Sequence, residues 1–277
     1  MKIPDFSINI YLLSAILLTG FCWYLLWSQS YYLSPVLFTG LWTGAAFILY
    51  SISRTGYPGI RTHLFLSVVS VPLWWWFELA NARLMNWKYI TDFDYGTYPY
   101  IALASISFST VIPALDSSHK FVGSFFPKVE EITKENIHKS IYWEMALGIS
   151  AITLLYLLPQ SMFPLLWIGP LLIIDSIAGL FTNRSFLHCF IQKKHMIMLS
   201  LSLSGILCGF MWEFWNNWAS PSWVYHIPIF EYLYVFEMPI LGYLGYIPFA
   251  WTVYQYQSLM KLFVNKYIFK QPFIVFK

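Results

Sequence analysis

Residues 209–230, GFMWEFWNNWASPSWVYHIPIF, follow the apolar run MIMLSLSLSGILCGF at 196–210. The first fifteen positions of this stretch hold four tryptophans, a single acid (Glu213) and two adjacent asparagines (Asn216 and Asn217). Tryptophan and tyrosine favour the boundary between membrane and water, so the pattern is typical of an apolar helix that ends at a membrane surface. The sequence therefore predicts a membrane protein with polar chemistry at one helix end.

The composition of the whole chain supports a membrane protein. Of 277 residues, 58% are hydrophobic and only 10% are charged, whereas a soluble domain has about 25% charged residues. The net charge of +3 is too small to indicate a nucleic-acid partner. The three cysteines show no metal-binding or redox spacing. We therefore expect no metal and no other cofactor.

Eight segments are long and apolar enough to be membrane helices. They lie near 8–27, 34–52, 63–82, 98–114, 140–158, 161–182, 196–216 and 236–256. Gly40 and Gly44 in the second segment form a GxxxG pair, which either marks a close helix contact or occurs by chance. We expect an all-α integral membrane fold of about eight transmembrane helices.

The distribution of lysine and arginine predicts the orientation of these helices. With eight helices, both termini share one side of the membrane with the loops after the second, fourth and sixth helix. Fourteen basic residues fall on that side, namely Lys2, Arg54, Arg61, Lys120, Lys128, Lys134, Lys139, Arg184, Lys193, Lys194, Lys261, Lys266, Lys270 and Lys277. Only Arg83 and Lys88 fall on the other side. Cytoplasmic loops are rich in lysine and arginine, so we expect both termini in the cytoplasm.

The two halves of the chain resemble each other. LWTGAAFILYSI at 41–52 aligns with LWIGPLLIIDSI at 166–177, and Glu78 and Asn81 align with Glu213 and Asn216. Each Glu-x-x-Asn is followed by Trp-x-Tyr, at 87–89 and at 223–225. We expect two parallel four-helix repeats related by an axis along the membrane normal. The expected divisions are a first repeat at 1–115, a charged cytoplasmic loop at 116–139, a second repeat at 140–260 and a basic cytoplasmic tail at 261–277.

Three acids at the outer ends of helices are the candidate catalytic residues. Glu78 and Glu213 lie near the ends of the third and seventh expected helices, and Glu237 begins the eighth. We expect the three carboxylates to face one cavity, where crowding in a poor dielectric favours the protonated form that a general acid needs. A spacing of three places Asn81 and Asn216 on the helix face of the neighbouring acid, where each amide could orient the carboxyl group. The alternative to a catalytic or binding site is that the two Glu-Asn pairs only join neighbouring helices through buried hydrogen bonds.

Aromatic and polar residues near these acids are the candidates for binding a substrate. Clustered indoles around an acid suit a cation, although interfacial anchoring explains tryptophans equally well. Asp175 lies deeper, where it could pair with Arg184, pair with a neighbouring helix, or line a substrate path. The candidate set is Asn81, Asn216, Asn217, Trp75, Trp212, Trp223, Tyr225, His226 and Asp175.

The second half also resembles known families. CGFMWEFWNNWASPSWVY and FEMPILGYLGYIPFAW resemble a widespread, largely uncharacterised family of bacterial multi-pass membrane proteins. More distantly, an acid at a helix end, a Trp-x-Tyr loop and an acid beside a proline are similar to the lycopene cyclase domain of carotenoid biosynthesis. That domain has paired acids after its proline, whereas this chain has a single acid before it, in Glu237-Met238-Pro239.

These resemblances imply a location and a function. The first implies the inner membrane of a bacterium. The second implies an enzyme or binding protein for a lipidic, isoprenoid or carotenoid-like molecule, with Glu213 or Glu237 as the proton donor. Two other classes remain open: a proton- or cation-coupled transporter or channel subunit, and a structural assembly factor. Membrane lipid is an expected partner in every case, and a homo-oligomer is left open.

Overall fold

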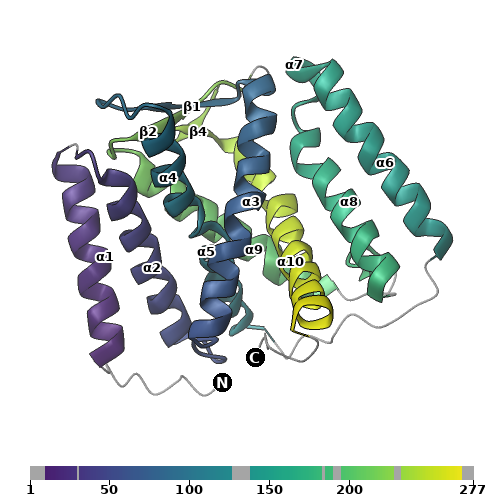
Figure 1. Ribbon diagram of the computed structural model, residues 1–277, viewed down its shortest axis with the longest axis horizontal. Coiled ribbons are helices and arrows are strands. Elements are labelled where there is room, and N and C mark those ends of the chain that lie inside the picture. The colour runs from purple at the N-terminus through teal and green to yellow at the C-terminus, as the bar shows by residue number, and fades with distance from the viewer. Residues whose placement is uncertain are drawn as a thin grey trace.

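Long apolar helices make up most of this computed structural model, which describes residues 10–29, 31–126, 138–182, 185–189, 195–227 and 232–269 (Figure 1). In chain order the helices are α1 (Ile10–Ser28), α2 (Ser34–Ile52), α3 (Ile60–Leu84), α4 (Thr97–Phe108), α5 (Val111–Gly123), α6 (His138–Leu157), α7 (Pro159–Met162), α8 (Leu165–Thr182), α9 (His195–Asn216) and α10 (Tyr246–Phe263).

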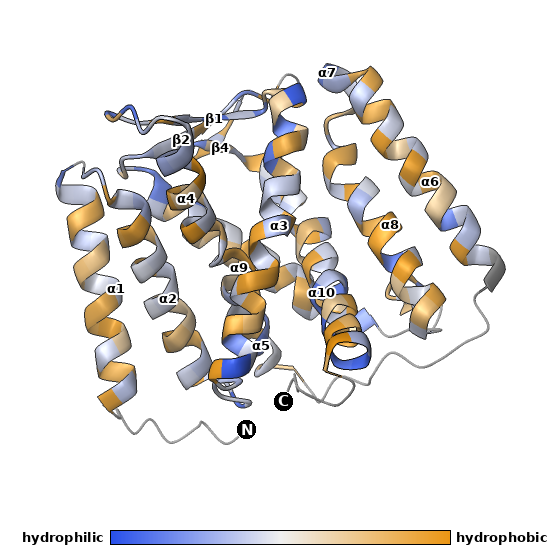
Figure 2. Cartoon of the chain, viewed as in Figure 1, coloured by the Kyte–Doolittle hydropathy of each residue, from blue (hydrophilic) through white to orange (hydrophobic). Residues whose placement is uncertain are grey.

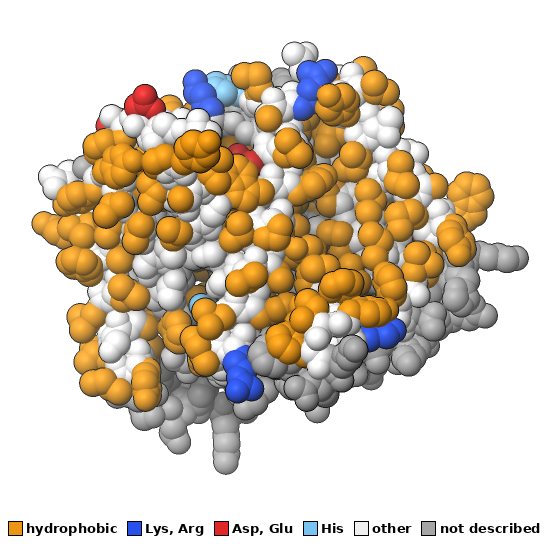
Figure 3. All heavy atoms as spheres, viewed as in Figure 1, with side chains coloured by type: hydrophobic (Ala, Val, Ile, Leu, Met, Phe, Trp, Pro, Cys, Tyr) orange, Lys and Arg blue, Asp and Glu red, His pale blue; other side chains and the backbone are white. Residues whose placement is uncertain are grey.

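The surface of this bundle is apolar along its length, which confirms an all-α membrane fold. Seven helical stretches in the described part are long and apolar enough to cross a membrane, with α4 and α5 counted as one. Apolar residues dominate the helices in Figure 2. Figure 3 shows hydrophobic side chains over most of one face, with lysine and arginine gathered near the two ends.

The bounds expected for the eighth helix, 236–256, are wrong. A short hairpin of β3 (Tyr234–Val235) and β4 (Met238–Pro239) comes first, and a 3₁₀ helix covers Ile240–Gly245. Only then does α10 begin, and it packs within the bundle against α8 and α9. Mean hydropathy does not distinguish this apolar hairpin and 3₁₀ turn from a helix, because all three are rich in the same residues.

The fourth expected helix, 98–114, is broken and extends further than its hydropathy predicts. The break falls at Ser109 and Thr110, whose hydroxyls donate back to carbonyl oxygens of the preceding turn. After it, α5 runs to Gly123, so the start of the expected loop at 116–139 is helical, and Asp116 is buried there. Most of the rest of that expected loop, residues 127–137, lies outside the described residues.

The helices form two outer pairs around a central group (Figure 1). The outer pairs are α1 with α2 and α6 with α8, and between them lie α3, α5, α9 and α10. Of the two alternatives for the GxxxG pair, the structure has the close contact: a Cβ on Gly40 would lie 2.7 Å from Cys22 Sγ of α1, and one on Gly44 would collide with Thr19. Small residues therefore let α1 and α2 approach closely.

A two-stranded antiparallel sheet covers one end of the central group, where loops were expected. It pairs β1 (Trp87–Ile90), just after α3, with β2 (Ser222–Tyr225), just after α9. The register places Trp87 opposite Tyr225 and Tyr89 opposite Trp223. The two Trp-x-Tyr motifs of the sequence are therefore paired with each other.

Candidate functional site

The alternation of side chains along β1 and β2 explains the Trp-x-Tyr spacing. Successive residues of a strand point to opposite faces, so tryptophan and tyrosine two positions apart share a face. Trp87, Tyr89, Trp223 and Tyr225 all line one cavity of about 160 Å³, whereas Lys88 between them is exposed. The sheet is thus a cover of the cavity that presents aromatic side chains to it.

The cavity lies between the two halves of the chain and its surface is almost entirely carbon. No acid, lysine, arginine or histidine is among the described residues that line it. Ten of its aromatic lining residues are Phe38, Trp74, Trp87, Tyr89, Trp167, Trp212, Trp223, Tyr225, Tyr246 and Phe249. Such a wall suits an apolar ligand.

Glu78 lies behind the part of this wall that comes from the first half of the chain. Its Oε1 accepts hydrogen bonds from Trp74 Nε1 at 2.9 Å, Trp87 Nε1 at 3.2 Å and the Tyr89 hydroxyl at 2.6 Å. All three donors belong to residues that line the cavity. The acid therefore fixes three aromatic side chains of the wall.

Glu213 has the corresponding place behind the second half of the wall. It is fully buried, and its Oε1 accepts from the Tyr225 hydroxyl at 2.7 Å and the Tyr246 hydroxyl at 2.5 Å. Trp223 Nε1 donates in turn to the Tyr225 hydroxyl at 2.8 Å. The other oxygen, Oε2, has no hydrogen-bond partner in the described part of the chain. Within the described part of the chain, Glu213 Oε2 can therefore either accept a further hydrogen bond or carry a proton.

Asn81 and Asn216 have a different role from the one expected. Neither amide bonds the neighbouring acid. The Asn216 side chain donates to the Trp223 carbonyl oxygen and accepts from the Trp223 N–H, both at 2.7 Å. Asn81 makes the same two bonds with Trp87, at 2.7 and 3.2 Å. Each asparagine thus holds the tryptophan of a Trp-x-Tyr motif against the end of the preceding helix.

The phenols behind the sheet are held in their neutral form. Burial raises the pKa of Tyr89 well above its ordinary value, and the charge of Glu78 raises it further. The pKa of Tyr225 is raised in the same way, first by burial and then by Glu213. Both hydroxyls therefore remain hydrogen-bond donors at neutral pH.

The expectation that three carboxylates face one cavity needs correction. Glu78 and Glu213 adjoin the same cavity, but each does so through tyrosine and tryptophan side chains. Glu237 lies in the turn between β3 and β4, partly buried, and does not begin a helix. It is close enough to Glu213 for their charges to interact, but it is not among the lining residues.

The substrate-binding candidates divide into two groups. Trp212, Trp223 and Tyr225 line the cavity, as expected. Trp75 does not, because it turns toward α4 and donates to Ser105 Oγ at 2.9 Å. His226 has an exposed side chain, and its backbone N–H donates to the Asn86 carbonyl oxygen at 2.7 Å. Asn217 lies in the turn after α9. None of these last three is among the lining residues.

Asp175 lies in the half of the bundle away from the sheet. It is fully buried and accepts from the Ser185 hydroxyl at 2.7 Å and from the backbone N–H groups of Phe186 and Leu187. The Gln255 amide of α10 also donates to it. The sequence left three alternatives for Asp175, and the structure has the pairing with a neighbouring helix. Arg184, the other possible partner, lies outside the described residues.

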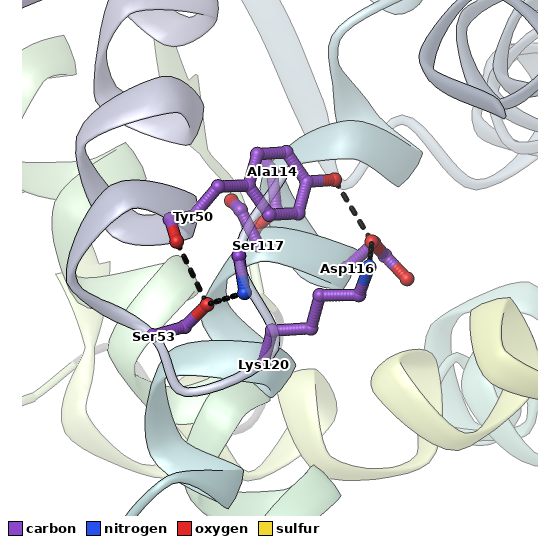
Figure 4. Close-up of polar contacts among 7 residues, drawn as sticks. Tyr50, Ser53, Ala114, Asp116, Ser117 and Lys120 are labelled. Carbon is purple, nitrogen blue, oxygen red and sulfur yellow. Dashed lines mark hydrogen bonds and ion pairs between the residues drawn. The ribbon is translucent and has the colours of Figure 1, made fainter. Parts of the chain in front are cut away.

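A second buried acid, which the sequence did not single out, lies in the same half of the bundle (Figure 4). Asp116 Oδ2 accepts from the Tyr50 hydroxyl at 2.8 Å and lies 3.6 Å from Lys120 Nζ. Tyr50 belongs to α2 and Asp116 to α5, just as Asp175 belongs to α8 and Gln255 to α10. Each outer helix pair is therefore joined to the central group by a buried acid.

Several lining residues were missed from the sequence, above all Trp167, Tyr246 and Phe249. Each lies on a helix that hydropathy alone assigns to lipid contact. The signal that could have found Tyr89 and Trp87 was present, since two aromatic residues separated by one position are typical of a strand. No group of three or more metal-ligating residues occurs in the described segments. No family model, curated protein or solved structure matches the chain.

Proposed function

We propose that the protein binds a lipidic, isoprenoid-like molecule in the aromatic cavity between its two halves. The observation that carries this proposal is a carbon-lined cavity whose aromatic wall is held by two acids, the half-buried Glu78 and the fully buried Glu213. A preformed apolar cavity with few convergent polar groups is the usual form of a small-molecule site. Its place in a membrane bundle favours a ligand that reaches it from lipid.

The chemistry that this site supports best is a proton-initiated rearrangement of a double bond, as in a lycopene cyclase-like reaction. A lining hydroxyl, of Tyr225 or Tyr246, would give its proton to a ligand carbon and take another from Glu213. The aromatic faces would stabilise the carbocation that results. A neighbouring ligand carbon would then lose a proton to the same tyrosine oxygen while that hydroxyl passes its own proton back to Glu213. This relay would complete the reaction and restore the protonated Glu213.

The two halves of the chain are, in this proposal, parallel repeats of one four-helix unit. Matched hydrogen bonds support it, since Asn81 and Asn216 clamp Trp87 and Trp223 alike.

Ring contacts across the halves support the same duplication. Trp42 of α2 packs on Trp212 of α9 with ring centroids 5.2 Å apart. Its aligned counterpart, Trp167 of α8, stacks on Phe77 of α3 at 5.4 Å. In the alignment of the halves, Phe77 is itself the counterpart of Trp212.

The orientation we propose is that of a bacterial inner-membrane protein with cytoplasmic termini. Its support is that α1 begins and α10 ends at the same end of the bundle (Figure 1). Arg54 and Arg61 follow α2 and begin α3 at that end, whereas Arg83 and Lys88 lie beside the sheet at the other. The aromatic cavity would then lie in the outer half of the membrane.

A coupled transporter is the second candidate, and one observation favours it. Acids lie in both halves of the bundle, with Glu78 and Glu213 beside the sheet and Asp116 and Asp175 buried in the other half. Acids in both halves are what a proton or cation path would need. Asp116 and Asp175 are, however, satisfied by protein donors, which is why ligand binding is the first proposal.

The test is to express the protein in a bacterial strain that accumulates lycopene, and to compare pigment extracts by chromatography and mass spectrometry. Glu213→Gln is the variant and Asn217→Ala the matched control, because Asn217 lies outside the cavity wall. A cyclised product that Glu213→Gln lacks and Asn217→Ala retains supports the proposed reaction. Lycopene that co-purifies without change supports binding alone. Well-folded protein that neither binds nor changes lycopene or any other isoprenoid contradicts the proposal.

A further inference from the structure

The ionisable groups that are hydrogen-bonded to the aromatic wall of the cavity are carboxyl groups in the described part of the chain. Glu78 and Glu213 lie directly behind its wall, and Glu237 lies near Glu213. Neither Glu78 nor Glu213 has a basic side chain among its described partners, and Lys120 forms its ion pair with Asp116 on α5. Among the described side chains, these two acids beside an apolar cavity thus have no hydrogen-bonded or ion-paired cation.

The hydrogen bonds of the wall turn its rings in a way that suits a cation. Glu78 Oε1 accepts from two indole N–H groups and a phenol, and N–H groups of tryptophan can only donate. The positive edges of these rings are thereby engaged with a carboxyl group. These polar edges are bonded to Glu78 and the cavity lining is almost entirely carbon, and aromatic faces attract cations.

The spacing of the rings fits a cage. Trp212 lies between Trp74 and Tyr246, with ring centroids 6.0 Å and 6.2 Å away. Phe249 lies 5.8 Å from Trp74 and 6.4 Å from Trp212. A cation within about 6 Å of a ring centroid is attracted to it, so one charge among these rings would contact several at once.

The loop beside the cavity carries acids as well. Asp92 and Asp94 are exposed on the segment that connects β1 to α4, between the lining residues Thr91 and Tyr95. The nearest base in the sequence, Lys88, is on the opposite face of the sheet from the cavity. Acids at the rim of a site raise the local concentration of cations.

We propose that the cavity selects ligands with a positive charge on an apolar body, such as a quaternary ammonium group with an alkyl chain. This inference rests on the proposed function, because it takes the cavity to be the ligand site and adds the sign of the charge. It also agrees with a reaction that passes through a carbocation, since the same wall would stabilise either species.

The test compares two probes of the same shape, hexyltrimethylammonium and 2,2-dimethyloctane, in which carbon replaces the nitrogen. Binding to the full-length protein in lipid nanodiscs is followed by tryptophan fluorescence, with probe concentrations corrected for partition into empty nanodiscs. The expected result is at least a tenfold tighter binding of the cation. Glu78→Gln and Glu213→Gln should each reduce that preference at least threefold. The control is Glu144→Gln, because Glu144 is a buried acid on α6 that does not line the cavity, and it should leave the preference unchanged.

The outcomes separate the two proposals. Equal binding of both probes, or a cation preference unchanged in Glu78→Gln and Glu213→Gln, overturns the inference and leaves the apolar site intact. If neither these probes nor lycopene binds to folded protein, both proposals fail. Should Glu213→Gln not fold, the half-buried Glu78→Gln variant decides the question alone.

Discussion

Asn216 illustrates how one side chain positions the site without touching it. Its amide satisfies both backbone groups of Trp223 and is itself fully buried. Without it, a buried N–H and a buried carbonyl oxygen would lose their partners, and each such loss costs about 1–3 kcal/mol. The clamp therefore stabilises the strand and fixes the tryptophan over the cavity.

We expect Asn216→Ala to lower the free energy of unfolding by about 2–4 kcal/mol, and Asn81→Ala to have a similar effect, because the two clamps are alike. Thermal unfolding in detergent measures both. Asn217→Ala is the control, since Asn217 is adjacent but lies in the turn after α9. Equal midpoints for Asn216→Ala and Asn217→Ala would contradict a clamp.

The raised pKa values of Tyr89 and Tyr225 predict a loss of stability at high pH. Both phenols have higher pKa values in the folded protein than in the unfolded chain, where the value is about 10. The folded state therefore binds more protons in that range. Their contribution is complete below about pH 10 and is lost as the pH rises through the folded values.

Unfolding midpoints measured between pH 8 and pH 11 test this prediction. We expect the wild type to lose more stability above pH 10 than Tyr225→Phe, which has no phenol to ionise at that position. Lysines titrate equally in both proteins and cancel in the comparison. Parallel pH profiles for the two proteins would show that the Tyr225 phenol is not protected.

Among the helices, the contact between α1 and α2 depends on glycine at one position and not at another. A methyl group on Gly44 would collide with the Thr19 side chain and would lie 2.9 Å from the Ala15 carbonyl oxygen. The position of Gly20 in the same pair is open, with nothing within 4 Å of an added Cβ. Gly44→Ala should therefore force the helices apart, whereas Gly20→Ala should not.

The expected result is a lower unfolding midpoint for Gly44→Ala and an unchanged or higher one for Gly20→Ala. Alanine is favoured over glycine in a helix by up to about 1 kcal/mol. Gly20→Ala should gain this stability, whereas the collision at Gly44 should outweigh it. Differential scanning fluorimetry of the two variants side by side is sufficient. Two gains of similar size would mean that α1 and α2 are not in close contact.

Helices that hydropathy defines well were predicted well, and the exceptions have physical causes. The ends of α2 and α8 match their expected bounds within a few residues. The end of α5 was missed because buried polar residues such as Asp116 look like a loop until Tyr50 is known to satisfy them. The sheet was missed because Trp87 pairs with Tyr225, and Tyr89 with Trp223, across more than 130 residues, which no local pattern specifies.

The cavity itself illustrates a further limit of sequence reasoning. Its acids were found from their cost in a membrane, and its indoles from their clustering. That Glu78 and Glu213 act through tyrosines could not be foreseen, because it depends on the register of β1 with β2. Tyr246 could not be identified from the sequence either, because its hydroxyl contacts Glu213 only when α10 packs against Gly209 of α9.

The molecule as a whole depends on the sheet to hold its two halves over one cavity. Lys88 and Val224 are direct partners in the register, on the face away from the cavity. Directly opposite residues of antiparallel strands have Cβ atoms about 4.5–5.5 Å apart, close enough for a disulfide after small adjustments. Cysteines at both positions should therefore join under mild oxidation.

We expect the double variant Lys88→Cys/Val224→Cys to give a disulfide-linked peptide pair in a non-reducing digest analysed by mass spectrometry. The combination Lys88→Cys/Ser222→Cys, two positions out of register, should give far less, and it controls for random collision. The buried native cysteines are the same in both proteins. Since the bond forms outside the cavity, the linked protein should still bind its ligand. Equal yields from the two variants would mean that the halves are not held in this register, and the shared aromatic wall would then have no basis.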